Sequence, residues 1–169
     1  MLVLGTRCRP FESGLPYKDY KNYKHMNNKK FIIFTDGAFS PNRNQGGSSF
    51  VIINNDKCIL KWIHPWKGGT NNTAELLAII YALKAIKNSV SSLTIYSDSM
   101  YCIGSINEGW KRNKNQKLWK IFDSEKKRIS LLCKDLTFKH IKGHDNSSEY
   151  SKWNNLADKY AVFASQLII

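Results

Sequence analysis

The sequence is short of acidic residues and of long apolar runs. Among its 169 residues, 13 are Asp or Glu and 26 are Lys or Arg, which gives a formal net charge of +13. No apolar run reaches the roughly eighteen residues of a membrane-spanning helix, and the first apolar stretch is too short for a secretory signal. We therefore expect neither a membrane protein nor a secreted one. The positive charge favours a polyanionic partner, above all a nucleic acid, over a generally basic protein without one.

Cysteine is also scarce, and its spacing excludes two kinds of structure. None of the cysteines forms a Cys-x-x-Cys pair, and none lies near a histidine at the spacing of a zinc site. We therefore expect neither a disulfide framework nor a zinc centre, but reduced thiols in an intracellular, reducing compartment. The cysteines are Cys8, Cys58, Cys102 and Cys133.

The first part of the chain, residues 1–29, has no helical or strand period. Basic and aromatic residues alternate in it, as at Tyr20 and Lys21. We interpret it as an N-terminal tail, or as a segment that drapes over a domain formed by residues 30–169. Interleaved aromatic and basic side chains could also stack on bases and contact phosphates, and this alternative stays open.

Apolar periodicity predicts a mixed α/β domain in the rest of the chain. Residues 31–34 read as a buried central strand that ends at Asp36 and turns on Gly37, with a loop over residues 39–47. Three strands in a row, then strands alternating with helices, predict a five-stranded sheet with antiparallel and then parallel strands and helices on both faces. The other expected strands are 48–53, 58–63, 93–96 and 136–141, and the expected helices are 72–86, 99–107, 116–133 and 152–165.

Four acids stand just past predicted strand ends or early in predicted helices. Each of them alone has an ordinary structural explanation. Asp36 could close a turn, Asp98 could cap a helix, and Asp158 could be a surface acid. With Asn72 as the N-cap, Glu75 would be the third helical residue, where a capping-box acid belongs.

Together, the four acids predict a site for divalent cations. Ligands gather at the carboxyl ends of parallel strands, where we expect Asp36 and Asp98. Converging carboxylates repel one another unless cations occupy the site, and hard oxygen ligands suit Mg²⁺ or Mn²⁺. Two such ions about 4 Å apart stabilise the attacking and leaving oxygens of a phosphoryl displacement. A basic protein with such a site is expected to be a nuclease.

Five short motifs carry these acids and a histidine. They are Thr35-Asp36-Gly37-Ala38, Thr70-Asn71-Asn72-Thr73-Ala74-Glu75, Tyr96-Ser97-Asp98-Ser99, Lys142-Gly143-His144 and Asn154-x-x-Ala157-Asp158. In this order, they resemble the motifs of the type 1 ribonuclease H family, from about residue 30 to residue 164. The resemblance implies a ribonuclease H-like fold. It also implies cleavage of the RNA strand of RNA/DNA hybrids, with 5′-phosphate and 3′-hydroxyl ends.

The resemblance also implies roles for individual residues. Asp36 would bridge two Mg²⁺ ions, for which Mn²⁺ can substitute. Glu75 and Asp98 would hold the ion on the leaving-group side, and Asp158 would share the ion that activates the nucleophilic water. His144 would assist product release or proton transfer. Asn154 would support the metal-bound water.

Substrate contacts are implied in the same way. Asn71 and Asn72 match positions that reach the minor groove of the hybrid, where shape and the 2′-hydroxyl distinguish RNA from DNA. Thr70 and Asn115 match positions of a phosphate pocket. Met100 stands where many relatives have Gln, so one groove hydrogen bond is in doubt. The alternative is that these polar residues only cap loops.

The chain also departs from the family pattern near the expected substrate. Gly68 stands where some relatives have Arg in the phosphate pocket, and Lys67 could replace that charge. A short basic loop takes the place of the extra helix of relatives with a basic protrusion. We expect Trp110, Lys111 and Arg112 of this loop to contact phosphates, and the alternative is a solvated turn.

Three functions remain to be distinguished. The first is a hybrid-specific endonuclease, acting as a monomer on RNA/DNA hybrids without a membrane partner. The second is a nuclease of the same fold that acts on DNA. The third is a hybrid-binding module without catalytic activity.

Overall fold

The computed structural model of the protein describes residues 29–143 and 149–167. Within them, the chain forms a five-stranded sheet and α-helices in the predicted order. No helix in this part of the chain is long and apolar enough to cross a membrane. The elements are β1 (Lys30–Ser40), the 3-10 turn η3 (Pro41–Arg43), β2 (Gln45–Asn54), β3 (Lys57–Lys67), α1 (Asn71–Ala85), β4 (Val90–Ser97), α2 (Met100–Asn107), α3 (Gln116–Ser130), β5 (Cys133–His140) and α4 (Ser151–Gln166).

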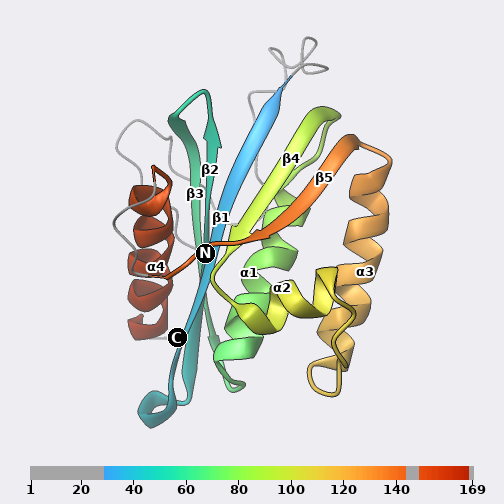
Figure 1. Cartoon of the computed structure of the whole chain (residues 1–169). Helices are drawn as coiled ribbons and strands as arrows, with labels where there is room; N and C mark the ends of the chain where they lie inside the picture. Colours follow the sequence, from blue (N-terminus) through green and yellow to red (C-terminus); the bar gives the residue numbers. More distant parts are fainter. Residues whose placement is uncertain (1–28, 144–148, 168–169) are drawn as a thin grey trace.

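The sheet is mixed and has the strand order β3-β2-β1-β4-β5. β2 is antiparallel to both β1 and β3, whereas β4 runs parallel to β1 and β5 parallel to β4. Figure 1 shows α4 on one side of the sheet and α1, α2 and α3 on the other. The prediction of a mixed sheet with helices on both faces is therefore confirmed.

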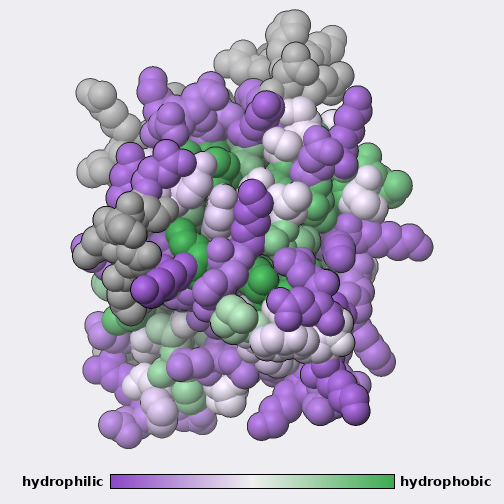
Figure 2. Space-filling model, in the orientation of Figure 1, coloured by the Kyte–Doolittle hydropathy of each residue, from purple (hydrophilic) through white to green (hydrophobic). Residues whose placement is uncertain are grey.

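Each face of the sheet has its own apolar core. Successive residues of a strand point to opposite faces. In β1, Ile33 packs into the core under α1, α2 and α3, while Phe34 packs into the smaller core under α4. This double burial explains why residues 31–34 are almost wholly apolar. Outside these cores, hydrophilic side chains cover most of the face of the molecule seen in Figure 2.

The prediction that the first strand ends at Asp36 is wrong, because β1 continues to Ser40. Its ladder with β2 extends through Asp36, which pairs with Ser49. The parallel ladder with β4, in contrast, ends at the pair Thr35–Ser97. At Asp36, β1 is therefore still paired with β2 but no longer with β4. The side of β1 that faced β4 is free there for a side chain from another element.

The predicted loop over residues 39–47 is also too long. Only η3 and Asn44, which has a φ of 46°, separate β1 from β2. The predicted second and third strands form an antiparallel hairpin, β2 and β3. Its turn consists of Asn55 and Asp56, with φ values of 48° and 56°, and such left-handed pairs match the twist of the flanking strands.

The predicted N-cap of the first helix, Asn72, is wrong as well. Gly68 and Gly69, with φ values of 80° and 88°, turn the chain after β3. The N-cap is then Thr70, whose hydroxyl accepts a hydrogen bond from the amide of Thr73, while the Thr73 hydroxyl accepts one from the amide of Thr70. Thr73 thus closes the capping box, and Glu75 has no part in it.

One helix end also differs from the prediction. The helix expected over residues 116–133 ends at Ser130, and Cys133 is instead the first residue of β5, where it pairs with Val90. An apolar residue such as Cys133 fits the buried side of a helix and of a strand equally well, so the pattern does not separate the two.

Candidate active site

Three carboxyl groups converge at the edge of the sheet. Asp36 comes from β1, Glu75 from α1, and Asp98 from the residue after β4. One oxygen from each lies within 4.8 Å of the others. Asp36 and Glu75 are only 6% and 9% exposed, so two of the three carboxyl groups are buried. This confirms that acids from distant parts of the chain meet at one point.

Glycine brings α1 close enough for this meeting. A Cβ atom added to Gly37 would lie 2.2 Å from the backbone nitrogen of Glu75 and 2.3 Å from the carbonyl carbon of Ala74. Any side chain at position 37 would therefore push the first turns of α1 away from β1. The expected turn at Gly37 is wrong, because β1 continues through it and pairs Gly37 with Ser48; the glycine instead allows the close approach of α1.

A second glycine lies against Asp98. A Cβ atom on Gly143 would lie 2.6 Å from Oδ2 of Asp98, so the segment after β5 passes directly over this carboxyl group. Asp98 itself is not the cap of α2, because Ser99 takes that role and its hydroxyl accepts from the amide of Cys102. The capping explanation of Asp98 is therefore wrong.

The pKa values of the two buried acids show how the groups interact. Burial raises the pKa of Asp36 well above its ordinary value, and the charges of Asp98 and Asp158 raise it further. Burial also raises the pKa of Glu75, and repulsion by Asp36 and Asp98 adds to this effect. The amide of Gly37 donates to Oδ1 of Asp36 at 2.9 Å. This hydrogen bond lowers the pKa of Asp36 and so offsets part of the rise.

α4 contributes the fourth acid and an amide. Asp158 is half-buried and outside the group of three, but its charge acts on Asp36. Asn154, one turn earlier, is buried, and its Oδ1 has no hydrogen-bond partner among the described residues. The same holds for Oε2 of Glu75. His144 lies outside the described residues.

This set of groups fits a divalent cation. Its members are hard oxygen donors that repel one another as anions, and two of them have a buried oxygen without a partner. A small, hard cation such as Mg²⁺ prefers carboxylate and carbonyl oxygens of this kind. Its charge would also relieve the repulsion that raises the pKa values of Asp36 and Glu75.

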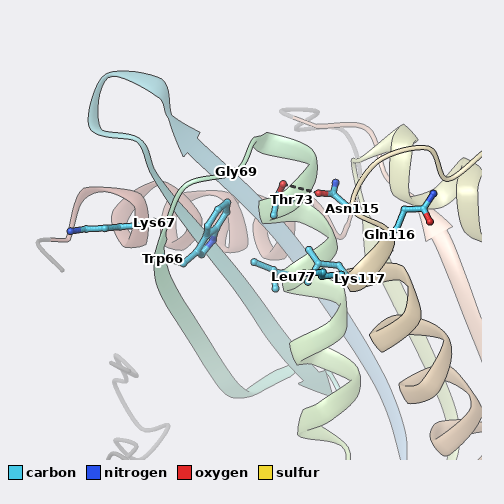
Figure 3. A pocket seen from close by; sticks show the side chains of 9 residues that line it. Trp66, Lys67, Gly69, Thr73, Leu77, Asn115, Gln116 and Lys117 are labelled. Carbon is cyan, nitrogen blue, oxygen red and sulfur yellow. Dashed lines mark hydrogen bonds between the residues drawn. The ribbon is translucent and has the colours of Figure 1, made fainter.

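A pocket of about 500 Å³ lies beside α1, between the end of β3 and the start of α3. Figure 3 shows Trp66 on one side of it and Asn115 on the other. The hydroxyl of Thr73 donates to Oδ1 of Asn115 at 3.1 Å, which joins the first turn of α1 to the N-cap of α3. Lys67 and Lys117 also belong to its lining, and Figure 3 shows the side chain of Lys67 extending away from the pocket.

The other residues proposed to contact substrate lie in different surroundings. Thr70, Asn71 and Asn72 are exposed at the start of α1, and Met100 is exposed at the start of α2. Thr70 itself does not line the pocket but reaches it through Thr73, since the two hydroxyl oxygens are 3.1 Å apart.

The basic loop is held partly by its own contacts. The guanidinium of Arg112 donates to both carboxylate oxygens of Asp123, at 2.8 and 3.0 Å, and lies 4.1 Å from the ring centre of Trp119. Lys111 is exposed. Trp110 is also 44% exposed, although its ring lies against Gly104, on which a Cβ atom would be 2.5 Å from that ring. Arg112 thus has a structural role in the loop.

Sequence reasoning missed several residues of the site. Thr73 had a detectable signal, since Thr70-x-x-Thr73 is a capping spacing, but Asn72-x-x-Glu75 has the same spacing and ends in the more usual capping-box acid. Trp66 and Lys117 had none, because they come from separate elements, β3 and α3, that meet only in the folded protein as the lining of one pocket. Gly143 was noted as part of a motif, and its contact with Asp98 depends on the path of the chain after β5.

Sequence comparison places this site among known proteins. A model of the family described as RNase H matches residues 28–166. The ribonuclease H of Syntrophus aciditrophicus is 35% identical over 146 residues, covering 79% of this chain and 81% of the relative. The ribonuclease H of Syntrophomonas wolfei is 36% identical over 143 residues, covering 79% of this chain and 94% of the relative.

Solved structures show the same architecture. RNase H1 from the halophilic archaeon Halobacterium salinarum superposes with a TM-score of 0.63 at 20% identity, covering 80% of this chain and 96% of that one. The protease-reverse transcriptase of prototype foamy virus superposes with a TM-score of 0.67 at 26% identity. That match covers 86% of this chain and 22% of the viral protein.

Proposed function

The chain belongs to the ribonuclease H family, and from this premise we propose that it hydrolyses the RNA strand of RNA/DNA hybrids. The products would carry 5′-phosphate and 3′-hydroxyl ends. Residues 30–169 would carry this activity as a monomer inside the cell. Burial raises the pKa of Cys102 to about 12, so this thiol stays protonated at neutral pH.

The observation that carries this proposal is the cluster of Asp36, Glu75 and Asp98. These acids lie within one small site of a protein whose net charge is +13. A basic surface attracts the phosphates of a nucleic acid, and an acidic cluster within that surface concentrates cations where hydrolysis takes place. A protein that only binds hybrids would gain nothing from burying acids that repel one another.

The residues would divide the work as follows. Asp36, Glu75 and Asp98, with Asp158 from α4, would hold two Mg²⁺ ions, for which Mn²⁺ can substitute. Bound in this way, the ions supply charge that stabilises the attacking and leaving oxygens of the phosphodiester. Asn154 would orient a water molecule through its buried Oδ1. His144, from the segment after Gly143, would move a proton or assist product release.

The pocket beside α1 would hold a phosphate of the substrate. Thr73 and Asn115 offer hydrogen-bonding groups there, and Lys67 and Lys117 offer positive charge. Lys67 would supply the positive charge of the Arg that some relatives have at position 68, once its side chain turns toward the pocket. Asn71 and Asn72, exposed in the same turn of α1, would read the minor groove of the hybrid.

A strand-labelled cleavage assay tests the proposed reaction. The same sequence is prepared as an RNA/DNA hybrid, as duplex DNA and as duplex RNA, with either strand labelled, in Mg²⁺ and in Mn²⁺. We expect cuts only in the RNA strand of the hybrid, with ends that carry a 5′-phosphate. Equal cutting of duplex DNA would instead indicate the DNA-cleaving alternative.

The variant Asp36→Asn tests whether the cluster performs the hydrolysis. We expect it to lower the cleavage rate by at least about a hundredfold, because the electrostatic stabilisation of the transition state is lost. Asp135→Asn is the matched control, since Asp135 is an exposed acid of β5 outside the cluster. Tight hybrid binding by the unaltered protein without any cleavage would favour the binding-module alternative.

A further inference from the structure

Three fully buried hydroxyl groups surround the acidic cluster. Thr35, Ser48 and Ser49 are each 0% exposed and lie on the two central strands β1 and β2. Each hydroxyl donates a hydrogen bond to a backbone carbonyl of a different element. A buried hydroxyl needs a partner, but it does not need a partner of this kind, since a carbonyl of its own strand would also serve.

The two serines reach helices on opposite faces of the sheet. They are neighbours in β2, so their side chains point in opposite directions. Ser48 donates to the carbonyl of Ala74 in α1 at 2.8 Å, and Ser49 donates to the carbonyl of Ala157 in α4 at 2.6 Å. The next residue after each acceptor is an acid of the site, Glu75 or Asp158.

Thr35 makes the same kind of hydrogen bond to a third element, β4. Thr35 donates to the carbonyl of Tyr96 in β4 at 3.1 Å, and Asp98 follows two residues later. Thr35 precedes Asp36, and Ser48 and Ser49 pair with Gly37 and Asp36 in the β1–β2 ladder. The donors therefore cluster around one acid, and their acceptors adjoin the other three.

This arrangement opposes the repulsion within the cluster. The acids repel one another as anions, and this repulsion pushes apart the elements that carry them. Each hydrogen bond attaches the backbone next to an acid to the central strands, at the point where that repulsion acts. A buried, fixed attachment holds a ligand more precisely than an exposed side chain does.

We propose that Thr35, Ser48 and Ser49 are positioning residues, which hold Glu75, Asp98 and Asp158 at metal-binding distance from Asp36 through the backbone of their elements. The proposal rests on the proposed function, because it assumes that the acids bind divalent cations. It predicts that loss of a hydroxyl weakens cation binding before it affects the chemical step.

Thr35 offers the sharpest test. Thr35→Val keeps the shape and removes the hydroxyl, whereas Thr35→Ser keeps the hydroxyl and removes a methyl group. We expect Thr35→Val to weaken Mn²⁺ binding, measured by calorimetric titration with Mn²⁺ alone, by about tenfold. Thr35→Ser should bind Mn²⁺ as the unaltered protein does. Equal binding by both variants, or equal weakening in both, would overturn the proposal.

Ser48→Ala and Ser49→Ala extend the test to the helices, and Ser165→Ala is the matched control. The hydroxyl of Ser165 is also buried and donates to a carbonyl, but that carbonyl belongs to Val162 of the same helix, α4. We expect both test variants to need several-fold more Mg²⁺ for half-maximal cleavage, with the rate restored at saturating Mg²⁺. Ser165→Ala should change only the thermal stability.

A purely structural role gives a different result. In that case, thermal unfolding in a chelator would move to lower temperature in all variants, while Mn²⁺ affinity would stay unchanged, and the proposal would be wrong. Failure of the proposed function is recognised separately. It would appear as an unaltered protein that neither binds Mn²⁺ at the cluster nor cleaves the hybrid.

Discussion

At the scale of single residues, Asp36 and Glu75 form a pair that cannot lose both protons without a cost. Both are buried, and burial, followed by the repulsion among the acids, raises the pKa of each carboxyl group. Asp98 adds a third charge within 4.8 Å. Protons and cations therefore compete for these carboxyl groups, and the stability of the folded protein depends on the pH and on the cation concentration.

The sign of the pH dependence follows from these pKa shifts. The pKa values of Asp36 and Glu75 in the folded protein lie above their ordinary values of 3.8 and 4.5. The folded state therefore holds protons that the unfolded state releases, and the contribution to stability is complete below about pH 4. It is lost as the pH rises through the raised pKa values.

We therefore predict that, in a chelator, the unaltered protein loses stability relative to Glu75→Gln as the pH rises from 5 to 8. Glu75→Gln removes one charge of the pair, so its own decline should be smaller. Urea unfolding at each pH measures the difference in the free energy of unfolding. Excess Mg²⁺ should reverse the trend for the unaltered protein. A difference that does not vary with pH would contradict a raised pKa of Glu75 in the folded protein.

At the scale of the elements, one arginine joins the helices on the larger core. Arg128 of α3 donates to the carbonyls of Leu83 and Ile86 at the end of α1, both at 2.8 Å. It also donates to Glu125 at 2.7 Å. The carbonyl of Leu83 also accepts from the amide of Ile86 at 3.1 Å. The contact with Arg128 adds a second donor to it, gives the carbonyl of Ile86 a donor, and places a positive charge at the helix C-terminus.

We predict that Arg128→Ala lowers the free energy of unfolding by about 2 kcal/mol, the value of charged hydrogen bonds to buried carbonyls. Arg128→Lys should restore only part of this loss, because an ammonium group does not have the planar geometry of the guanidinium. The exposed neighbour Lys127 is the control, and Lys127→Ala should stay within about 0.5 kcal/mol. Urea titration measures all three. Equal effects at positions 127 and 128 would contradict the role given to Arg128.

The elements also show what the sequence could and could not predict. The order of strands and helices was predictable, because apolar period and turn residues are local signals. The end of β1 was not, since Asp36 and Gly37 look like a turn until the β2 ladder continues past them. Likewise, Asn72 is as good an N-cap as Thr70 in the sequence, and only the turn at Gly68 and Gly69 decides between them.

The site was predictable to a similar extent. The acids were found because they adjoin strand ends and early helical turns, and three of them do meet. The hydroxyl groups of Ser48 and Ser49 gave no signal, because serine is common in strands near turns. Their importance depends on which carbonyls lie opposite them, and those belong to residues distant in the sequence.

At the scale of the whole molecule, the net charge of +13 should dominate binding to nucleic acid. Each phosphate that a lysine neutralises releases a counterion, so affinity falls steeply with salt. The lysines that matter are those that meet the substrate. Lys67 and Lys117 line the pocket beside α1, whereas Lys57 lies at the opposite end of β3, about 33 Å along the strand.

We predict that replacing Lys67 and Lys117 by Gln flattens the slope of log affinity against log salt by about 1.5 units, since two phosphate contacts are lost. Lys57→Gln should leave the slope unchanged. Fluorescence anisotropy with a labelled hybrid, in the Asp36→Asn background to prevent cleavage, measures the slope. If Lys57→Gln flattened the slope as much as the double replacement does, binding would depend on overall charge and the pocket would have no special role.

The place of α4 in the chain has a consequence for biosynthesis. α4 is the last of the described elements, yet it covers the core that contains Phe34 and Val51 and carries Asp158. The hydrogen bond from Ser49 to Ala157 joins residues 108 positions apart. During translation, β1 and β2 leave the ribosome long before α4. Until α4 emerges, the apolar face of the nascent sheet that this helix covers is exposed to water and prone to aggregation. Chains that terminate before α4 should therefore be both inactive and insoluble, and the nascent protein should depend on chaperones until this helix emerges.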